Sequence, residues 1–154
     1  MDDLVFRPYR ARDVDACLRL FDGNVPDFFA PDERAEFVGF LRDIGPWPYL
    51  VGETGGHVVA CGGFEVAGRV ARLTFGMVER TRQGQGIGQA LTKARLAAIR
   101  QTAGVERVAI ETSQKSAGFY DRLGFLVTEV TENGFGPGLD RWVMVLEVGP
   151  TESG

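Results

Sequence analysis

Apolar and polar residues alternate along residues 70–78, which is the pattern of a β-strand with one buried face. The apolar positions of this stretch are Ala71, Leu73, Phe75 and Met77, and the positions between them include Arg72, Thr74 and Gly76. We therefore expect the first set on the buried face of a strand and the second set on its other face.

The period changes to that of a helix directly after this strand. Ile87, Leu91, Ala94 and Ala98 recur at helical spacing, and Gly104 follows where a C-cap is expected. The pattern predicts a helix over about 87–101. Residues 79–86 between the two elements are rich in glycine, so the segment is predicted to be a strand, a turn and a helix.

The chain before this segment predicts two helices and further strands. A short strand over 4–7 leads into a helix with apolar positions Val14, Cys17, Leu18 and Phe21, and residues 22–31 turn. A second helix carries Phe37, Phe40, Leu41 and Ile44. Strands over 49–53 and 57–66 flank the hairpin signal Thr54-Gly55-Gly56, so with 69–78 they are predicted to form an antiparallel meander of three consecutive strands.

The chain after the helix predicts a parallel partner strand over 105–111, a short helix through Tyr120, a strand over 125–131, a loop over 132–138 and a last strand over 140–148. The sum is an α+β fold, with a mixed, largely antiparallel central sheet of six to seven strands and about four helices on its faces. We expect a single domain over 1–148 and a frayed tail over 149–154.

Composition excludes several classes of protein. A chain of 154 residues with 44% hydrophobic content suffices for one compact core. The formal charge of −4 and the pI near 5.1 disfavour nucleic-acid binding. No apolar run approaches the ~20 residues of a membrane helix, and the acidic start lacks a signal-peptide pattern. Cys17 and Cys61 fit small buried side chains, so we expect a cytoplasmic protein with no metal site; a homodimer stays open.

The glycine-rich turn is the candidate for chemistry. Backbone N–H groups at the start of a helix attract an anion such as a pyrophosphate. A P-loop is excluded because no Gly-Lys-Ser or Gly-Lys-Thr follows the turn. The dinucleotide fingerprint is weakened because Gln89 stands where its third glycine is expected, and because half of the chain precedes the turn.

Two sequence blocks resemble the GNAT superfamily of acetyl-CoA-dependent N-acyltransferases. Residues 83–88, Gln-Gly-Gln-Gly-Ile-Gly, match that family's Gln/Arg-x-x-Gly-x-Gly/Ala motif. Residues 116–125, Ser-Ala-Gly-Phe-Tyr-Asp-Arg-Leu-Gly-Phe, match its Ala-x-x-Phe-Tyr-x-x-Leu-Gly-Phe helix. The resemblance implies a GNAT-like fold with two splayed strands that hold pantetheine, and transfer of an acetyl group from acetyl-CoA to a primary amine of a small molecule or a protein.

The resemblance also implies which residues bind the cofactor: Met77, Val78, Gln83, Gly84, Gln85, Gly86, Ile87, Gly88, Gln114 and Lys115. The N–H groups of residues 83–88 would bind the pyrophosphate, and the N–H of Val78 would bind the oxyanion. The family usually carries arginine at one or both of positions 83 and 85, where this chain has glutamine. Arg80, Arg82 or Lys115 are the candidates to supply positive charge instead.

Catalytic and acceptor residues are harder to choose. Tyr120 is the candidate donor of a proton to the CoA thiolate, and Glu111 heads the candidates for a general base that acts through water, beside Glu79 and Glu65. His57 is the only histidine and lies in a predicted exposed hairpin.

The acceptor pocket is expected between the first two helices and the loop before the last strand. Its candidate residues are Phe28, Phe29, Trp47, Phe135 and Asp140. Two other functions stay open: a non-catalytic acyl-CoA-binding module, since no carboxylate lies within residues 70–76, and an NAD-dependent oxidoreductase.

Overall fold

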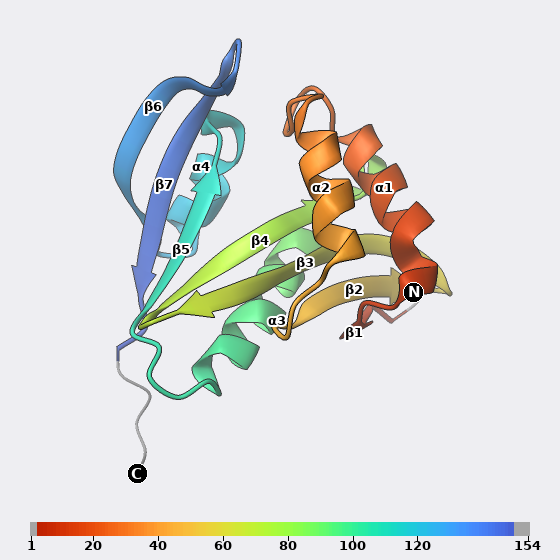
Figure 1. Cartoon of the computed structure of the whole chain (residues 1–154), viewed down its shortest axis with the longest axis horizontal. Helices are drawn as coiled ribbons and strands as arrows, with labels where there is room; N and C mark the ends of the chain where they lie inside the picture. The colour runs from red at the N-terminus through yellow and green to blue at the C-terminus, as the bar shows by residue number, and fades with distance from the viewer. Residues whose placement is uncertain (1–2, 150–154) are drawn as a thin grey trace.

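A computed structural model describes residues 3–149, and their strands form one mixed sheet of seven (Figure 1). Its spatial order is β1-β2-β3-β4-β5-β7-β6, and every neighbouring pair is antiparallel except β4 and β5. The strands are β1 (Val5–Pro8), β2 (Tyr49–Thr54), β3 (His57–Ala67), β4 (Val70–Val78), β5 (Arg107–Thr112), β6 (Leu126–Gly136) and β7 (Leu139–Glu147). The predicted fold class, meander and parallel pair are confirmed.

Four α-helices cover the two faces of the sheet. Helices α1 (Val14–Gly23) and α2 (Glu33–Arg42) lie on one face, and α3 (Ile87–Arg100) and α4 (Gln114–Arg122) lie on the other (Figure 1). Two short 3-10 helices, Ala11–Asp13 and Arg80–Arg82, join these elements. Each helix buries one apolar stripe against the sheet, as expected for amphipathic helices on the surface of a domain.

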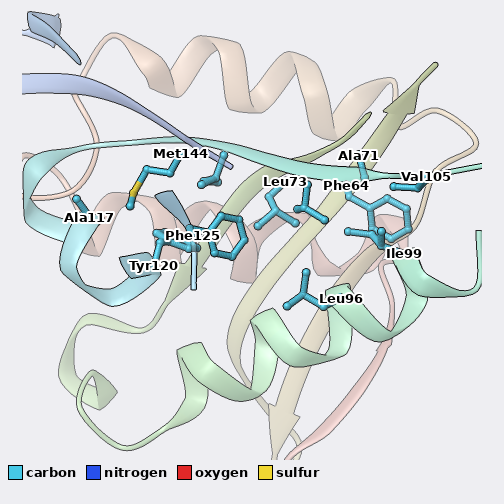
Figure 2. Close-up of a cluster of buried hydrophobic side chains, with 12 residues drawn as sticks. Phe64, Ala71, Leu73, Leu96, Ile99, Val105, Ala117, Tyr120, Phe125 and Met144 are labelled. Atoms are coloured by element: carbon cyan, nitrogen blue, oxygen red, sulfur yellow. The ribbon is translucent and has the colours of Figure 1, made fainter. Parts of the chain in front are cut away.

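The two faces have separate hydrophobic cores. On the α3 and α4 face, Leu96 and Ile99 pack with Leu73, Tyr120 and Phe125 (Figure 2), together with the other buried residues of that cluster. On the opposite face, a second cluster joins α1 and α2 to the sheet, and it includes both cysteines, which are buried and free.

Strands β4 and β5 pair over only a short length. Their register runs from Val70 opposite Arg107 to Arg72 opposite Ala109 and then stops, although β4 continues to Val78 and β5 to Thr112. The two strands therefore diverge, and within residues 3–149 the backbone of β4 after Arg72 has no strand neighbour on that side. Figure 1 shows the resulting wedge between them.

The predicted alternation along β4 is wrong in its second half. The pairing with β3 shifts between Cys61 and Gly63, and Phe75 adopts a positive φ of 35° at this bulge. A bulge inserts one extra residue, so the facing of every later side chain is reversed. Ala71 and Leu73 pack in the core under α3, whereas Phe75 and Met77 pack in the core under α1 and α2.

The bulge is held by a buried tyrosine. The Tyr49 hydroxyl donates a hydrogen bond to the Phe75 carbonyl at 2.8 Å, and burial raises the pKa of Tyr49 well above its usual range. The ring of Phe75 is fixed between Phe37 and Phe40 of α2, with centroids 4.9 and 5.1 Å away. Phenylalanine is rare at positive φ, and these contacts keep the Phe75 side chain in one position.

Two boundaries also differ from the predictions. Helix α2 ends at Arg42, before Ile44, and the predicted loop over 132–138 is mostly strand, because β6 continues to Gly136. Residues 150–154 of the predicted tail lie outside the described residues. Within residues 3–149, no helix combines the length and the apolar character needed to cross a membrane.

Candidate active site

A cavity of about 1010 Å³ occupies the wedge between β4 and β5. It is lined from both faces of the sheet, by the glycine turn, α3 and α4 on one side and by α2 and the segment before it on the other. Both faces contribute because the sheet is interrupted where the two strands separate. One continuous space can therefore hold two ligands that enter from opposite faces.

The glycine turn forms one end of this cavity. Gly84 and Gly86 have φ angles of 84° and 83°, and Gly86 is the N-cap of α3. The first helical hydrogen bond runs from the Ala90 N–H to the Gly86 carbonyl, so the N–H groups before Ala90 have no partner within the helix. Gly84, Gly86 and Gly88 line the cavity, which makes this turn a fitting site for an anion.

Not every predicted residue of the turn faces the cavity. Gln83 lines it, whereas Gln85 does not and its side chain is exposed. The Ile87 side chain is buried against Val59, Ala60 and Leu91, so only its backbone is available to a ligand at this end.

The edge of β4 presents backbone groups to the cavity, which Met77 and Val78 both line. The Glu79 N–H donates to the Val59 carbonyl of β3 at 2.8 Å. Because backbone groups alternate in direction along a strand, the Val78 N–H points away from β3 and toward the wedge. The sequence-predicted donor for an oxyanion therefore has the required orientation.

A hydrogen-bonded chain that the sequence did not reveal connects this edge to the turn. Asn24, only 2% exposed, donates through Nδ2 to the carbonyls of Leu20 at 2.8 Å and Val78 at 3.0 Å. Its Oδ1 accepts from Gln83 Nε2 at 2.9 Å, and Gln83 Oε1 accepts from Arg80 at 2.9 Å. The Gln83 side chain thus positions the turn, and no local pattern marks Asn24 for this task.

The candidate cations are mostly engaged by carboxylates. Arg80 donates to Asp27 at 2.9 Å and stacks over Phe28 at 5.0 Å, and Lys115 lies 3.7 Å from Asp27. The hydrogen bond from Arg80 lowers the pKa of Asp27. Among the three predicted cations, Lys115 lines the cavity and Arg80 and Arg82 do not.

Tyr120 is the proton donor that the sequence predicted. It belongs to α4, lines the cavity and is 8% exposed. Its ring is in edge contact with Phe125 at 5.4 Å (Figure 2). A second edge contact, with Phe119, has a centroid distance of 5.0 Å. These contacts fix the ring from two sides. The phenol is therefore held at the cavity wall, close in the fold to the diverging strands.

The predicted carboxylates differ in their surroundings. Glu111 lines the cavity, but its carboxylate accepts a hydrogen bond from Arg141, which also binds Glu129. Glu79 does not line the cavity and is bound by His57 at 3.1 Å and Arg82 at 2.9 Å. Glu65 is exposed on β3 and also lies away from the cavity.

Glu33 is a cavity carboxylate that the sequence analysis missed. It is half-buried at the start of α2, and its Oε2 accepts a hydrogen bond from the Ala30 N–H at 2.7 Å. Burial raises the pKa of Glu33, and Glu36 on the next turn adds to the rise. Only the position of α2 beside the wedge distinguishes this residue from the other acidic residues of a helix N-terminus.

The predicted acceptor residues are partly brought together. Phe28, Phe29 and Phe135 line the cavity. Trp47 packs instead against the core near Phe64, with ring centroids 6.3 Å apart. Asp140 accepts a hydrogen bond from the Asn133 N–H at 2.8 Å and does not line the cavity.

Gln114 also lies outside the cavity. Its side chain donates to the Gly138 carbonyl at 2.9 Å and accepts from the Asp140 N–H at 2.8 Å. It therefore fastens the β6–β7 turn to α4, which is a structural task and not the predicted contact with a cofactor.

Comparison with known proteins supports one family. Residues 14–125 match the model of the acetyltransferase (GNAT) family. A search of curated proteins by sequence gives no match.

Three solved structures are similar in fold. The ribosomal-protein-S18-alanine N-acetyltransferase from Escherichia coli is 17% identical, with 98% of this chain and 97% of that chain covered and a TM-score of 0.81. The protein yncA from Salmonella typhimurium, solved with its cofactor acetyl-CoA, is 20% identical, with 99% and 98% covered and a TM-score of 0.77. An aminoglycoside 6'-N-acetyltransferase complexed with coenzyme A is 15% identical, with 97% and 99% covered and a TM-score of 0.77.

Proposed function

Because this chain belongs to the GNAT family of acetyltransferases, we propose that it transfers an acetyl group from acetyl-CoA to a primary amine, by direct attack in a ternary complex. The observation that carries the proposal is the cavity in the β4–β5 wedge, which ends at the glycine turn and opens to both faces of the sheet. A related fold solved with acetyl-CoA supports the choice of donor. The two free, buried cysteines suit a reducing compartment such as the cytoplasm.

The donor fits the groups that line the cavity. The free N–H groups of residues 84–88 would bind the pyrophosphate at the positive end of α3, and the unpaired edge of β4 would hydrogen-bond the pantetheine amides. Lys115 adds positive charge at the mouth. The thioester would then lie beside Met77 and Val78.

The reaction combines an attack on the thioester, cleavage of the C–S bond and proton transfers. The neutral amine attacks the thioester carbonyl, and the N–C bond forms as the carbonyl oxygen becomes an oxyanion that the Val78 N–H stabilises. The C–S bond then breaks, and Tyr120 donates its phenolic proton to the departing thiolate. A carboxylate takes the proton that the amine loses, and solvent returns a proton to Tyr120.

Two carboxylates of the cavity compete for the role of base. Glu33 is half-buried and has a raised pKa, which brings its basicity closer to neutral pH, and no cation among the described residues forms an ion pair with it. Glu111, the sequence-based candidate, is held by Arg141. We therefore assign the base to Glu33 ahead of Glu111.

The acceptor end of the cavity favours a cationic amine. Glu33 and Glu36 provide negative charge there. Aromatic rings and carboxylates both attract an ammonium group before it loses its proton. The acceptor would thus approach from the α2 face while the donor occupies the opposite one. The aromatic surface at this end comes from Phe28, Phe29, Phe40 and Phe135.

A panel of primary amines with acetyl-CoA tests the function directly. Release of free thiol that depends on both the amine and the protein is the expected result. If acetyl-CoA raises the melting temperature but no amine gives thiol release, the result contradicts catalysis. It then favours the alternative, a non-catalytic acyl-CoA-binding module. If NAD stabilises the protein and acetyl-CoA does not, the result contradicts both the acetyltransferase and the acyl-CoA-binding module.

We predict that Gly86→Asp abolishes acetyl-CoA binding, because it adds a side chain and a negative charge where phosphate oxygens approach the turn. The matched control is Gly68→Asp, since Gly68 also has a positive φ, of 61°, and an open surrounding, but lies in the β3–β4 turn. Calorimetric titration of both variants should show a loss in the first alone. Equal affinity in both would mean that the phosphates bind elsewhere.

Tyr120→Phe should lower turnover about 10²-fold while acetyl-CoA affinity is kept, because only the proton donor is removed and the ring still packs. A merely structural hydroxyl would instead cost ~1 kcal/mol of stability and leave turnover intact. Tyr9→Phe, which removes a hydroxyl outside the cavity, is the control. Turnover of Tyr120→Phe within twofold of the parent would remove the phenol from the mechanism.

Glu33→Gln should lower turnover more than Glu111→Gln does, because the amide oxygen of the new side chain can still accept the Ala30 hydrogen bond but cannot take a proton. A base acts only when deprotonated, so the parent rate should rise with pH through the raised pKa of Glu33. That limb of the kcat profile should disappear in Glu33→Gln. If Glu111→Gln has the larger effect and removes the limb, the sequence-based assignment is the right one.

A further inference from the structure

Arg95 is a buried cation without an anionic partner. It lies on α3, is 1% exposed and lines the cavity. Its Nη1 donates to the Gly63 carbonyl at 3.4 Å and its Nη2 to the Thr92 hydroxyl at 3.5 Å, both longer than a good hydrogen bond. Its Nε has no partner, and no carboxylate within residues 3–149 forms an ion pair with it.

Two glycines create the space for its guanidinium. A Cβ on Gly76 would lie 2.8 Å from both Nη1 and Nη2, and a Cβ on Gly62 would lie 3.3 Å from Nη1. The guanidinium is therefore seated against the backbone of β3 and β4 from the α3 side. Gly76 directly precedes Met77 and Val78, so the charge lies next to the strand edge at which the thioester is proposed to bind.

This arrangement is unfavourable unless an anion completes it. The guanidinium of arginine keeps its charge inside proteins. A buried charge that lacks both a counter-ion and a full set of hydrogen bonds loses its hydration without compensation. A carboxylate satisfies a guanidinium best, because its two oxygens match the paired N–H groups. The cavity that Arg95 lines is the route by which such a group would arrive.

We propose that Arg95 binds a carboxylate carried by the cavity's ligand, and that this carboxylate ends the acyl group of the donor. The proposal rests on the acyltransferase function proposed above and names a substrate class for it: a half-thioester of a dicarboxylic acid with CoA. Arg95 lies on the same face of the sheet as α4 and the glycine turn, which is the face assigned to the donor. An acceptor carboxylate would instead meet Glu33 and Glu36 at the other end, which repel it.

The chemistry of transfer is unchanged by this substrate. The carbonyl carbon at the thioester passes from sulfur to the amine nitrogen, the thiolate takes its proton as before, and the second carboxylate keeps its charge throughout. Arg95 would position the acyl chain by binding that carboxylate. It would also make this donor bind more tightly than acetyl-CoA, which the site still accepts, because only the dicarboxylic acyl chain pairs with the guanidinium.

A matched pair of donors tests the proposal on the full-length protein. Succinyl-CoA and butyryl-CoA have acyl chains of four carbons and differ in the terminal carboxylate. Calorimetric titration should show succinyl-CoA binding at least ~10-fold more tightly than butyryl-CoA, a difference of about 1.4 kcal/mol. Arg95→Met should abolish this ratio, and Arg95→Lys should keep part of it. The control Arg122→Met, an exposed arginine of the same cavity, should leave the ratio unchanged.

The second arm distinguishes the source of the carboxylate. Acetyl-CoA is tested with 4-aminobutyrate and with butylamine as acceptors. The protein could prefer 4-aminobutyrate to butylamine, lose this preference in Arg95→Met and show no preference between the two donors. This result would overturn the assignment to the donor and give the carboxylate to the acceptor. Equal binding of both donors by the parent, or a ratio that both Arg95 variants keep, would overturn the proposal as a whole. Failure to bind any acyl-CoA would contradict the proposed function instead.

Melting temperature separates binding from a structural role. Because Arg95→Met removes an unpaired buried charge, the ligand-free variant should melt at a temperature equal to or above that of the parent. Arg95→Met could instead melt at a lower temperature or fail to fold, while Arg95→Lys keeps the donor ratio unchanged. Arg95 would then be a structural residue, and the proposal would be overturned.

Discussion

The separation of β4 from β5 is the constraint on which the rest of the structure depends. The two parallel strands share only the pairs from Val70 and Arg107 to Arg72 and Ala109, and beyond them β4 has an unpaired edge. Unpaired backbone groups in a protein interior are unfavourable unless they find partners. The wedge therefore suits a ligand with amide and carbonyl groups, and the cavity at this position offers the space for one.

The bulge at Phe75 adapts the strand to this wedge. By reversing the facing of later side chains, it turns Met77 into the α1 and α2 core and leaves Gly76 against α3. The Tyr49 hydroxyl and the rings of α2 hold the irregular residue from one face, while the Arg95 guanidinium fills the glycine slot on the other. Strand edge, bulge and buried charge are thus parts of one packing arrangement.

Charge is distributed unevenly along the cavity. The amide groups of the turn and Lys115 line one part of the cavity, Arg95 lies against Gly76 of β4, and Glu33 and Glu36 line the part at α2. Arg72, Glu111 and Arg122 are the other charged residues of the lining. A donor rich in phosphate and an acceptor that is a cation would each be attracted to a different end. The chain through Asn24, Gln83 and Asp27 links the two sides of the mouth, so the turn and the acceptor-side loop keep a fixed relation.

The sequence by itself determined the elements and the glycine turn before α3, because both depend on local information. Periodicity marks strands and helices, and Gly84 and Gly86 mark a turn with positive φ directly before a helix. The tertiary structure alone decided what depends on contacts between distant segments. The reversal after Phe75 arises from pairing with β3, and Asn24, Glu33 and Arg95 become cavity residues only because α1, α2 and α3 pack around the wedge. The same reason explains why three predicted site residues lie outside the cavity: Trp47, Gln114 and Asp140. Their residue types suit a binding site, but the packing of the elements fixes where their side chains point.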